Sequence, residues 1–204
     1  NDLYYNFDAS ATPNLENQMA AAAGEVNNAL NIFFVNSITT GSEFNAAGYA
    51  YLPFNNQVST RILMDNFYVT YAPTGTFVHE LGHTFGLLHT HEGTENGNTH
   101  PDAERVVRTG PNANCDTDGD FLCDTEADPR YDNTNFDNNT CTYLSGRVDD
   151  LGQAYIPPTE NIMSYYPDIC GAPFTPGQLT AIAQGLLTRQ GHTAYSLNAP
   201  AMAV

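Results

Sequence analysis

The stretch that decides the fold is HELGHTFGLLH, residues 79–89. On a helix, residues four apart lie on one face about one turn apart, so His79 and His83 can direct imidazole nitrogens at a single metal ion. Glu80 lies next to that face, where it is placed to hold a water molecule rather than to act as a ligand. The spacing therefore predicts a metal site carried by a helix.

A third imidazole, His89, cannot come from the same straight helix, because six residues beyond His83 is about 600° of rotation. Gly86 supplies the turn, since glycine tolerates a positive φ where a helix ends. Three histidines leave the fourth position of a tetrahedral zinc open for water, which is the catalytic arrangement. The alternative is an amphipathic helix with core or solvated histidines. Requiring the extra glycine and histidine makes a chance match about 400-fold rarer than HExxH alone.

This stretch resembles the long zinc signature of the metzincin metalloproteases, and Met163 looks like their Met-turn. Further stretches resemble the pappalysin branch, the ulilysin-like secreted proteases. They are residues 30–37, 48–53, 115–125 and 174–178. The likeness covers about residues 26–190.

The resemblance implies a metzincin-like α/β (α+β) fold. This fold has a twisted mixed sheet with an antiparallel, substrate-binding edge strand, a backing helix, the zinc helix, and a loop-rich C-terminal part ending in a helix. We expect one catalytic domain over residues 1–204, with an upper part of about 1–86 and a lower part of about 87–204. A chain of 204 residues is long enough for one core.

Charge excludes some partners. Six arginines, no lysine and 23 acidic residues give a net charge of −17, which argues against nucleic acid or an anionic membrane. No run approaches the ~18 apolar residues of a membrane span, and the first residues do not have the charged-then-apolar pattern of a leader, which we expect to have been removed already if the protein is exported. We expect a monomer that acts on proteins or peptides.

Four cysteines follow the zinc motif, at positions 115, 123, 141 and 170. An even number without CxxC pairs favours two disulfides and an oxidising, secreted setting, but leaves three pairings open. We favour Cys115 with Cys123, which would close an acidic loop. The other pair is then Cys141 with Cys170, behind the Met-turn, where the resemblance also places a bridge.

Periodicity predicts helices over residues 14–30, from about 76 to 88, and over 176–190, and strands over 31–35, 46–52, 61–65 and 67–71. The strand over 31–35 is apolar enough to be covered on both faces. In metzincin-like architecture the strand over 46–52 is the exposed edge that pairs with substrate. Gly48 would allow close backbone approach, with Tyr49 and Ala50 beside it. An ordinary edge strand is an equal alternative.

Residues 91–150 are polar, yet cysteines and clustered carboxylates argue for order there. The acidic run over residues 116–120 can fold around Ca²⁺, but it is not an EF-hand, because Ala127 stands where that motif needs glutamate. The alternative is a solvated acidic loop. The calcium ligands we expect are Asp116, Asp118, Asp120, Asp124 and Thr125.

The chemistry implied is peptide-bond hydrolysis, in which zinc activates water and Glu80 acts as general base and then general acid. Tyr165 resembles the tyrosine that some metzincins place near the metal, where its hydroxyl can bind the oxyanion, although an ordinary packed tyrosine is as good a reading. His91, His100 and His192 lack ligand spacing and are expected on the surface.

Two questions of function stay open in the sequence. Asp168, behind the Met-turn, favours a basic substrate side chain just after the scissile bond, but Gly171 stands where relatives with that preference carry an acidic residue. The rival to a secreted zinc endopeptidase is a binding or adhesion module stabilised by zinc and calcium. Loss of the general base would mark such a module, and Glu80 is present.

Overall fold

The computed structural model describes residues 6–8, 13–27, 29–39, 45–54, 59–70, 75–94, 100, 102–132, 134–171 and 173–193. Two compact units divide the chain, one of residues 1–86 and 183–204, the other of residues 87–182. Helix α5 (Pro176–Thr193) contributes residues to both units. The division of the catalytic domain expected from the sequence stays a prediction.

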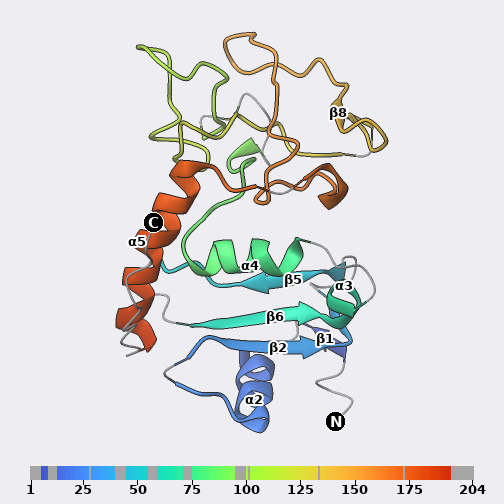
Figure 1. Cartoon of the computed structure of the whole chain (residues 1–204), viewed down its shortest axis with the longest axis vertical. Helices are drawn as coiled ribbons and strands as arrows, with labels where there is room; N and C mark the ends of the chain where they lie inside the picture. Colours follow the sequence, from blue (N-terminus) through green and yellow to red (C-terminus); the bar gives the residue numbers. More distant parts are fainter. Residues whose placement is uncertain are drawn as a thin grey trace, which may run out of the picture. The chain divides into compact units, whose positions relative to one another are not determined.

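The main sheet of the first unit has the strand order β2-β6-β5 (Figure 1). Strand β2 (Asn31–Val35) runs parallel to β6 (Arg61–Asp65), and β5 (Gly48–Ala50) pairs antiparallel with β6. Both β2 and β6 have the expected bounds. In the described chain, β5 therefore stands at one edge of a mixed sheet.

A second, smaller sheet has the order β1-β3-β4. It contains β1 (Asn6–Asp8), β3 (Ser37–Thr39) and β4 (Asn45–Ala46). The single strand expected over residues 46–52 is wrong, because its first residue pairs in this sheet while Gly48–Ala50 pair in the other. The short aromatic run over residues 3–7 also suggests a strand; its residues 3–5 lie outside the described chain, and β1 contains residues 6 and 7.

The core of this unit is built from Phe7, Met19, Val35, Ile38 and Leu63, which bury their side chains against one another. The expectation that β2 is covered on both faces is wrong. Ile32 is 37% exposed and Phe34 55% exposed, whereas Val35 is buried. One face of β2 thus has less covering than its apolar composition predicts.

Helix α2 (Pro13–Ala23) is shorter than the expected helix over residues 14–30. Gly24 adopts a φ of +80°, and the Glu25 N–H donates to the Ala20 carbonyl at 2.9 Å. These are features of a Schellman C-cap, in which a left-handed glycine stops the helix. The apolar residues beyond Gly24 keep the helical spacing in the sequence, but they are not part of the helix.

The strand expected over residues 67–71 is wrong. Residues Asn66–Thr70 form helix α3, and Tyr71 lies outside the described residues. The Asp65 Oδ1 accepts a hydrogen bond from the Phe67 N–H at 2.8 Å. This N-cap nucleates a helical turn, and it overrides the β-favouring composition of the segment.

Helix α5 begins after Thr175, as expected, and runs three residues beyond its expected end. The Gln178 N–H donates to Thr175 Oγ1 at 3.1 Å, and the Thr175 N–H donates to Gln178 Oε1 at 2.9 Å. This reciprocal pair is a capping box, which satisfies two N–H groups at the helix start.

Arg189 of α5 holds three separate segments of the first unit together. It is 2% exposed, and its Nε donates to the Thr84 carbonyl at 2.8 Å. Its Nη atoms donate to the carbonyls of Ser59 and Tyr51. Burial lowers the pKa of the guanidinium, so the carbonyls compensate for the loss of water. Arg189 therefore satisfies the carboxyl end of the helix that ends at Thr84.

We expect Arg189→Met to lower the free energy of unfolding by roughly 3 kcal/mol or more, because it leaves three carbonyls without their charged donor. Urea unfolding measures this loss. Arg105→Met, which removes a partly exposed arginine paired with Asp150, is the matched control and should cost under about 1 kcal/mol. A loss below 1 kcal/mol for Arg189→Met would show that the buried contacts contribute little.

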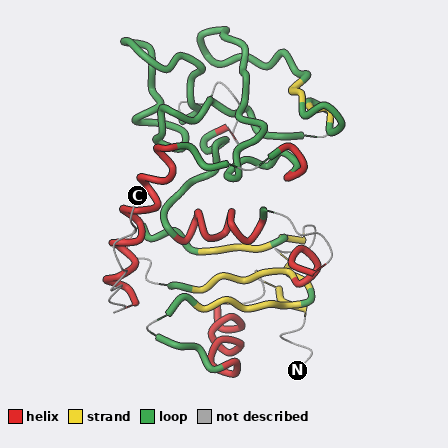
Figure 2. The backbone as a smooth tube through the Cα atoms, in the orientation of Figure 1, coloured by secondary structure: helices red, strands yellow, loops and turns green. Residues whose placement is uncertain are grey.

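The second unit consists mainly of loops and turns (Figure 2). Its regular elements are the paired strands β7 (Phe136–Asp137) and β8 (Thr142–Tyr143), the short helix η2 (Asp168–Cys170) and the first turns of α5. Disulfides join Cys115 to Cys123 and Cys141 to Cys170, the two pairs expected. Cross-links of this kind order a polar segment that lacks a large core. No helix in the described ranges is long and apolar enough to span a bilayer.

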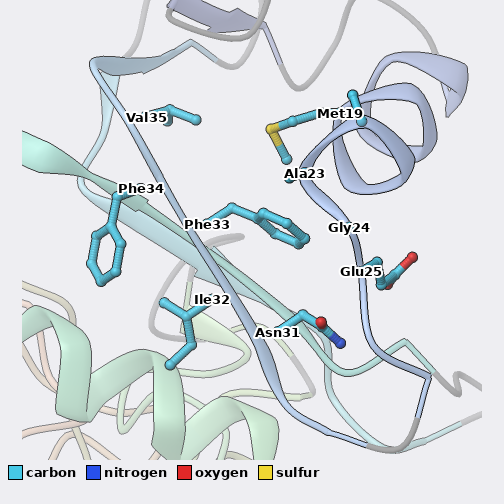
Figure 3. Close-up of a pocket in the computed structure, with 10 residues that line it drawn as sticks. Met19, Ala23, Gly24, Glu25, Asn31, Ile32, Phe33, Phe34 and Val35 are labelled. Carbon is cyan, nitrogen blue, oxygen red and sulfur yellow. The ribbon is translucent and has the colours of Figure 1, made fainter.

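A pocket of about 670 Å³ lies between α2 and β2 (Figure 3). Met19 and Ala23 border it from the helix, and Phe33 and Val35 border it from the strand. None of the histidines of the HExxH stretch lines this pocket. The pocket is therefore separate from the residues that the sequence selects for chemistry.

Candidate metal centre

Helix α4 (Thr76–Thr84) carries the first part of the motif. The sequence Thr74-Gly75-Thr76 suggests a cap for this helix, but Thr74 lies outside the described residues, and the helix begins after Gly75 without a side-chain cap. The expected extension to about Leu88 is wrong, because the helix stops at Thr84. Gly86 has a φ of +96°, so the predicted glycine turn is confirmed, and it ends the helix earlier than apolar periodicity suggests.

The three histidines come together. The Nε2 atoms of His79 and His83 lie 3.0 Å apart. Two ligands at ~2.0–2.1 Å from a tetrahedral zinc are separated by about 3.3 Å, so this spacing suits one shared ion. One ligand nitrogen of each of His79, His83 and His89 lies within 4.8 Å of the others. Among the described residues this is the only group of three or more metal-capable side chains that close together.

Glu80 is 5% exposed, and its Oε2 has no hydrogen-bond partner among the described residues. Burial raises the pKa of this carboxyl to about 8. A nearby cation would favour the ionised form and lower that pKa. A buried carboxylate with an unused oxygen, beside two metal-capable imidazoles, is suited to handling a proton from water.

Gly48 is required for the position of Glu80. A Cβ atom at Gly48 would lie 3.0 Å from Glu80 Cγ and 2.9 Å from Met64 Sδ. The side chains of Glu80 and Met64 therefore occupy the space that a side chain at position 48 would need. Pairing of this strand with a substrate backbone stays a prediction.

The neighbours of Gly48 are held by α2. The Tyr49 hydroxyl donates to Glu16 Oε2 at 2.9 Å, and the Tyr51 hydroxyl contacts the same oxygen. Burial and the Glu16 charge raise the pKa of Tyr49 well above its usual value. The Tyr49 side chain is thus engaged with α2, which leaves the backbone of Tyr49 and Ala50 as the part of the strand suited to pairing.

Met163 is fully buried and lies in a turn held by amides. Its N–H donates to Asn161 Oδ1 at 2.9 Å, and Asn161 pairs with Gln178 through two hydrogen bonds. The Thr90 N–H donates to the Met163 carbonyl at 3.2 Å. The residue that follows His89 is therefore fixed to the turn.

The Tyr165 ring lies 4.7 Å from the His89 ring and 4.5 Å from the His91 ring, between ring centroids. Tyr165 is 45% exposed, whereas His91 is 1% exposed and stacks on His89 at 4.7 Å. The expectation of a surface His91 is wrong, because the turn folds it under its neighbour. His100 and His192 are partly exposed.

Asp128 is a residue that the sequence did not single out. It is 0% exposed, and its carboxylate accepts hydrogen bonds from the hydroxyls of Thr90 and Tyr166 at 2.7 and 3.4 Å. These residues directly follow His89 and Tyr165. No local motif marks Asp128, since these two partners lie 38 residues away on either side.

The five expected calcium ligands are only partly assembled. Thr125 Oγ1 donates to Asp120 Oδ2 at 2.9 Å, and both residues are buried. Asp124 instead caps α5, where its Oδ2 accepts the Gly177 N–H at 2.7 Å. Asp116 is exposed. Among the described residues, no three of the expected carboxylates cluster within 4.8 Å.

Glu104 is a second residue missed by the sequence analysis. It is 1% exposed, contacts Arg108, and has an Oε2 without a hydrogen-bond partner among the described residues. Burial raises its pKa to about 9, against the lowering effect of Arg108, and the charge of Asp120 adds to the rise. Gly119, next to Asp120, leaves the space that the Glu104 side chain fills.

Asp168 begins η2 and is exposed, and Gly171 follows that helix with a φ of +109°. Ile169, beside Asp168, is 81% exposed. The segment behind the Met-turn therefore presents one carboxylate and one apolar side chain to solvent. A role for Asp168 in specificity stays a prediction.

Comparison of folds identifies the class. The chain has a fold similar to that of mature mirolysin from Tannerella forsythia, solved in complex with a cleaved peptide. The TM-score is 0.52 and the identity 19%, over 93% of this chain and 67% of that one. The mixed sheets, the helix carrying HExxH and the third histidine beyond it thus define a metzincin-like fold.

The family follows from sequence. The chain belongs to metallo-peptidase family M12, because the Reprolysin_5 model of that family matches residues 3–139. It is 31% identical to human pappalysin-1 over 157 residues, which is 74% of this chain and 9% of that protein. It is 29% identical to an extracellular metalloprotease of Arthroderma benhamiae over 175 residues, 80% of this chain and 53% of that protein. The chain thus spans about half of such fungal relatives and a small part of pappalysin-1.

Proposed function

We propose that this chain is a secreted zinc endopeptidase that hydrolyses peptide bonds in proteins. The observation that carries the proposal is the group of His79, His83 and His89 next to a buried Glu80. Membership of a metallo-peptidase family supports it. Two disulfides and relatives named extracellular metalloproteases support secretion.

The donor set fits zinc, because three neutral imidazoles suit this ion and leave one position for water. When bound, zinc lowers the pKa of a coordinated water to about 7 and polarises a carbonyl. Glu80 accepts the proton from that water and returns it to the leaving amine. Its unused Oε2 is the atom suited to both transfers. The hydroxyl of Tyr165, whose ring contacts that of His89, would donate a hydrogen bond to the developing oxyanion.

Substrate would lie extended along β5, paired with the backbone of Gly48 to Ala50. The edge position of β5 in the described sheet supports this. Asp168 would favour a basic side chain just after the scissile bond. The chain would act as a monomer.

Digestion of an unfolded protein mixture tests this function. The chain should generate new amino termini within the proteins, and a zinc chelator should stop their formation. Restored zinc should restore cleavage at the same bonds. Zinc binding with no new termini would contradict the proposal and favour a binding module of the same fold.

We also propose a structural Ca²⁺ bound by Asp120, with Glu104 and Thr125 beside it. The support is the unused, buried Oε2 of Glu104 together with the buried pair of Asp120 and Thr125. Two carboxylates and a hydroxyl or carbonyl are hard oxygen donors of the kind that calcium binds. A bound cation would also relieve the cost of burying these charges.

Calcium should raise the melting temperature of the stripped protein at pH 8 by about 5 °C or more, because only the folded state binds it. Glu104→Gln should remove most of this rise. The pKa of Glu104 is raised to about 9 in the folded protein. Its stabilising contribution is therefore present below its unfolded pKa, near 4.5, and is lost as pH rises through about 9. Without calcium, Glu104→Gln should accordingly lose less stability than wild type between pH 6 and 8.5.

Thermal unfolding at several pH values, with and without calcium, measures both effects. Glu126→Gln, which neutralises an exposed carboxylate of the same region, is the control and should behave as wild type. An equal calcium response in Glu104→Gln and wild type would exclude Glu104 as a ligand.

A further inference from the structure

Six arginines supply the cationic side chains of this chain apart from its histidines. Four of them pair with carboxylates, and these are Arg61, Arg105, Arg108 and Arg147. Arg189 is buried against backbone carbonyls. Arg130 is exposed, and within the described ranges no carboxylate lies at ion-pair distance from it. In so acidic a protein, an arginine without an acidic partner stands out as a ligand-binding group.

Arg130 lies close to the candidate metal centre. Its Cζ is 5.7 Å from the centroid of the Tyr165 ring, within the range of a cation–π contact. The Tyr165 ring in turn lies 4.7 Å from the ring of His89. The guanidinium is therefore separated from a metal-capable histidine by one aromatic side chain.

The backbone of Arg130 is held in an uncommon conformation. Its φ is +66°, which costs a non-glycine residue energy and persists only where neighbours impose it. Asp128 Oδ1 accepts the Arg130 N–H at 2.8 Å, and the Asn135 amide donates to the Arg130 carbonyl at 3.1 Å. Asp128 and Asn135 are 0% and 2% exposed. Two buried side chains thus fix the direction in which Arg130 leaves the loop.

The Asp128 carboxylate also connects the Arg130 loop to the segments of the candidate metal centre. Asp128 also accepts hydrogen bonds from Thr90 and Tyr166, which directly follow His89 and Tyr165. One buried residue therefore positions the arginine, the histidine segment and the tyrosine segment together.

We propose that Arg130 is a specificity-determining residue that binds a carboxylate of the peptide substrate beside Tyr165. The proposal rests on the proposed peptidase function. A guanidinium binds a carboxylate through two parallel hydrogen bonds, which gives both strength and orientation. The carboxylate belongs either to an Asp or Glu side chain or to the carboxyl terminus of a peptide. The surrounding negative charge repels such groups, so one local cation decides whether they bind.

Paired peptides test this with the zinc-loaded protein. One series carries Glu or Gln at each position on either side of the scissile bond, and a second ends in a free carboxylate or an amide. Wild type should prefer the carboxylate by about tenfold in kcat/KM at one position. The preference should disappear in Arg130→Gln, persist in part in Arg130→Lys, and weaken with added salt. Arg105→Gln, which removes a like charge from the same unit, should retain it.

The proposal would be overturned if wild type cleaved the Glu and Gln peptides, and the acid and amide peptides, with equal kcat/KM at every position. It would also be overturned if Arg130→Gln kept the wild-type preference for the carboxylate. If no peptide is cleaved at all, the proposed function fails, and binding decides this inference separately. The dissociation constants of the paired peptides are then compared in zinc-loaded Glu80→Gln protein, with and without Arg130→Gln. Equal values for the charged and neutral peptides would show that Arg130 binds no carboxylate.

Discussion

Glu80→Gln is expected to lower kcat for peptide hydrolysis by about 10²–10⁴-fold and to leave one zinc bound per chain. The amide cannot carry the proton from water to the leaving amine, but the three imidazoles are untouched. Because Glu80 is 5% exposed and burial raises its pKa, a neutral amide of the same size should fit the site without loss of stability. The defect should therefore appear in turnover alone.

Three measurements on one sample separate these effects: zinc content, melting temperature and kcat. Glu126→Gln provides the matched control, because it makes the same change at an exposed site and should retain wild-type turnover. Turnover within a few-fold of wild type in Glu80→Gln would assign the proton transfer to another group.

His83→Ala is expected to have the larger effect on the metal. Loss of an outer group that only orients a metal ligand weakens binding by about 10–100-fold, and loss of a ligand should exceed that. The Nε2 atoms of His79 and His83 are 3.0 Å apart, close enough to share one ion, so alanine at position 83 removes one of the three donors. Turnover should fall with zinc content.

Competition with a chelator of known affinity measures the change in zinc binding. His100→Ala is the control, since this partly exposed histidine lies outside the three-histidine group. Stoichiometric zinc of unchanged affinity in His83→Ala would show that His83 is not a ligand.

The sequence predicts those features that depend on neighbours a few residues apart. Two histidines four residues apart on a helix, the glycine turn at Gly86 and the helix that starts at Pro176 each follow from local patterns, and the structure has all three. The two disulfide pairs were also expected, Cys115 with Cys123 because it closes the acidic loop and Cys141 with Cys170 with the added support of the family resemblance. Local patterns fail where two compete, as at Asp65, whose cap turned an expected strand into α3.

The remaining features depend on contacts between distant segments. Asp128 is 38 residues from each of two partners. Glu104 lies 16 residues before Asp120 in the sequence, yet its side chain packs against the neighbouring Gly119. His91 is buried because the chain turns back under His89, which its spacing does not reveal. No periodicity or motif in a single sequence encodes these positions, so they became visible only with the fold.

The central claim is that one metal ion held by His79, His83 and His89 carries out hydrolysis with Glu80. The most direct test adds zinc in steps to the stripped chain and measures bound zinc and peptide turnover in the same samples. Turnover should rise in proportion to bound zinc, stop at one equivalent, and stay near zero at full loading in Glu80→Gln. Turnover that survives complete removal of zinc, or a fully loaded wild-type chain that cleaves no peptide, would contradict the claim.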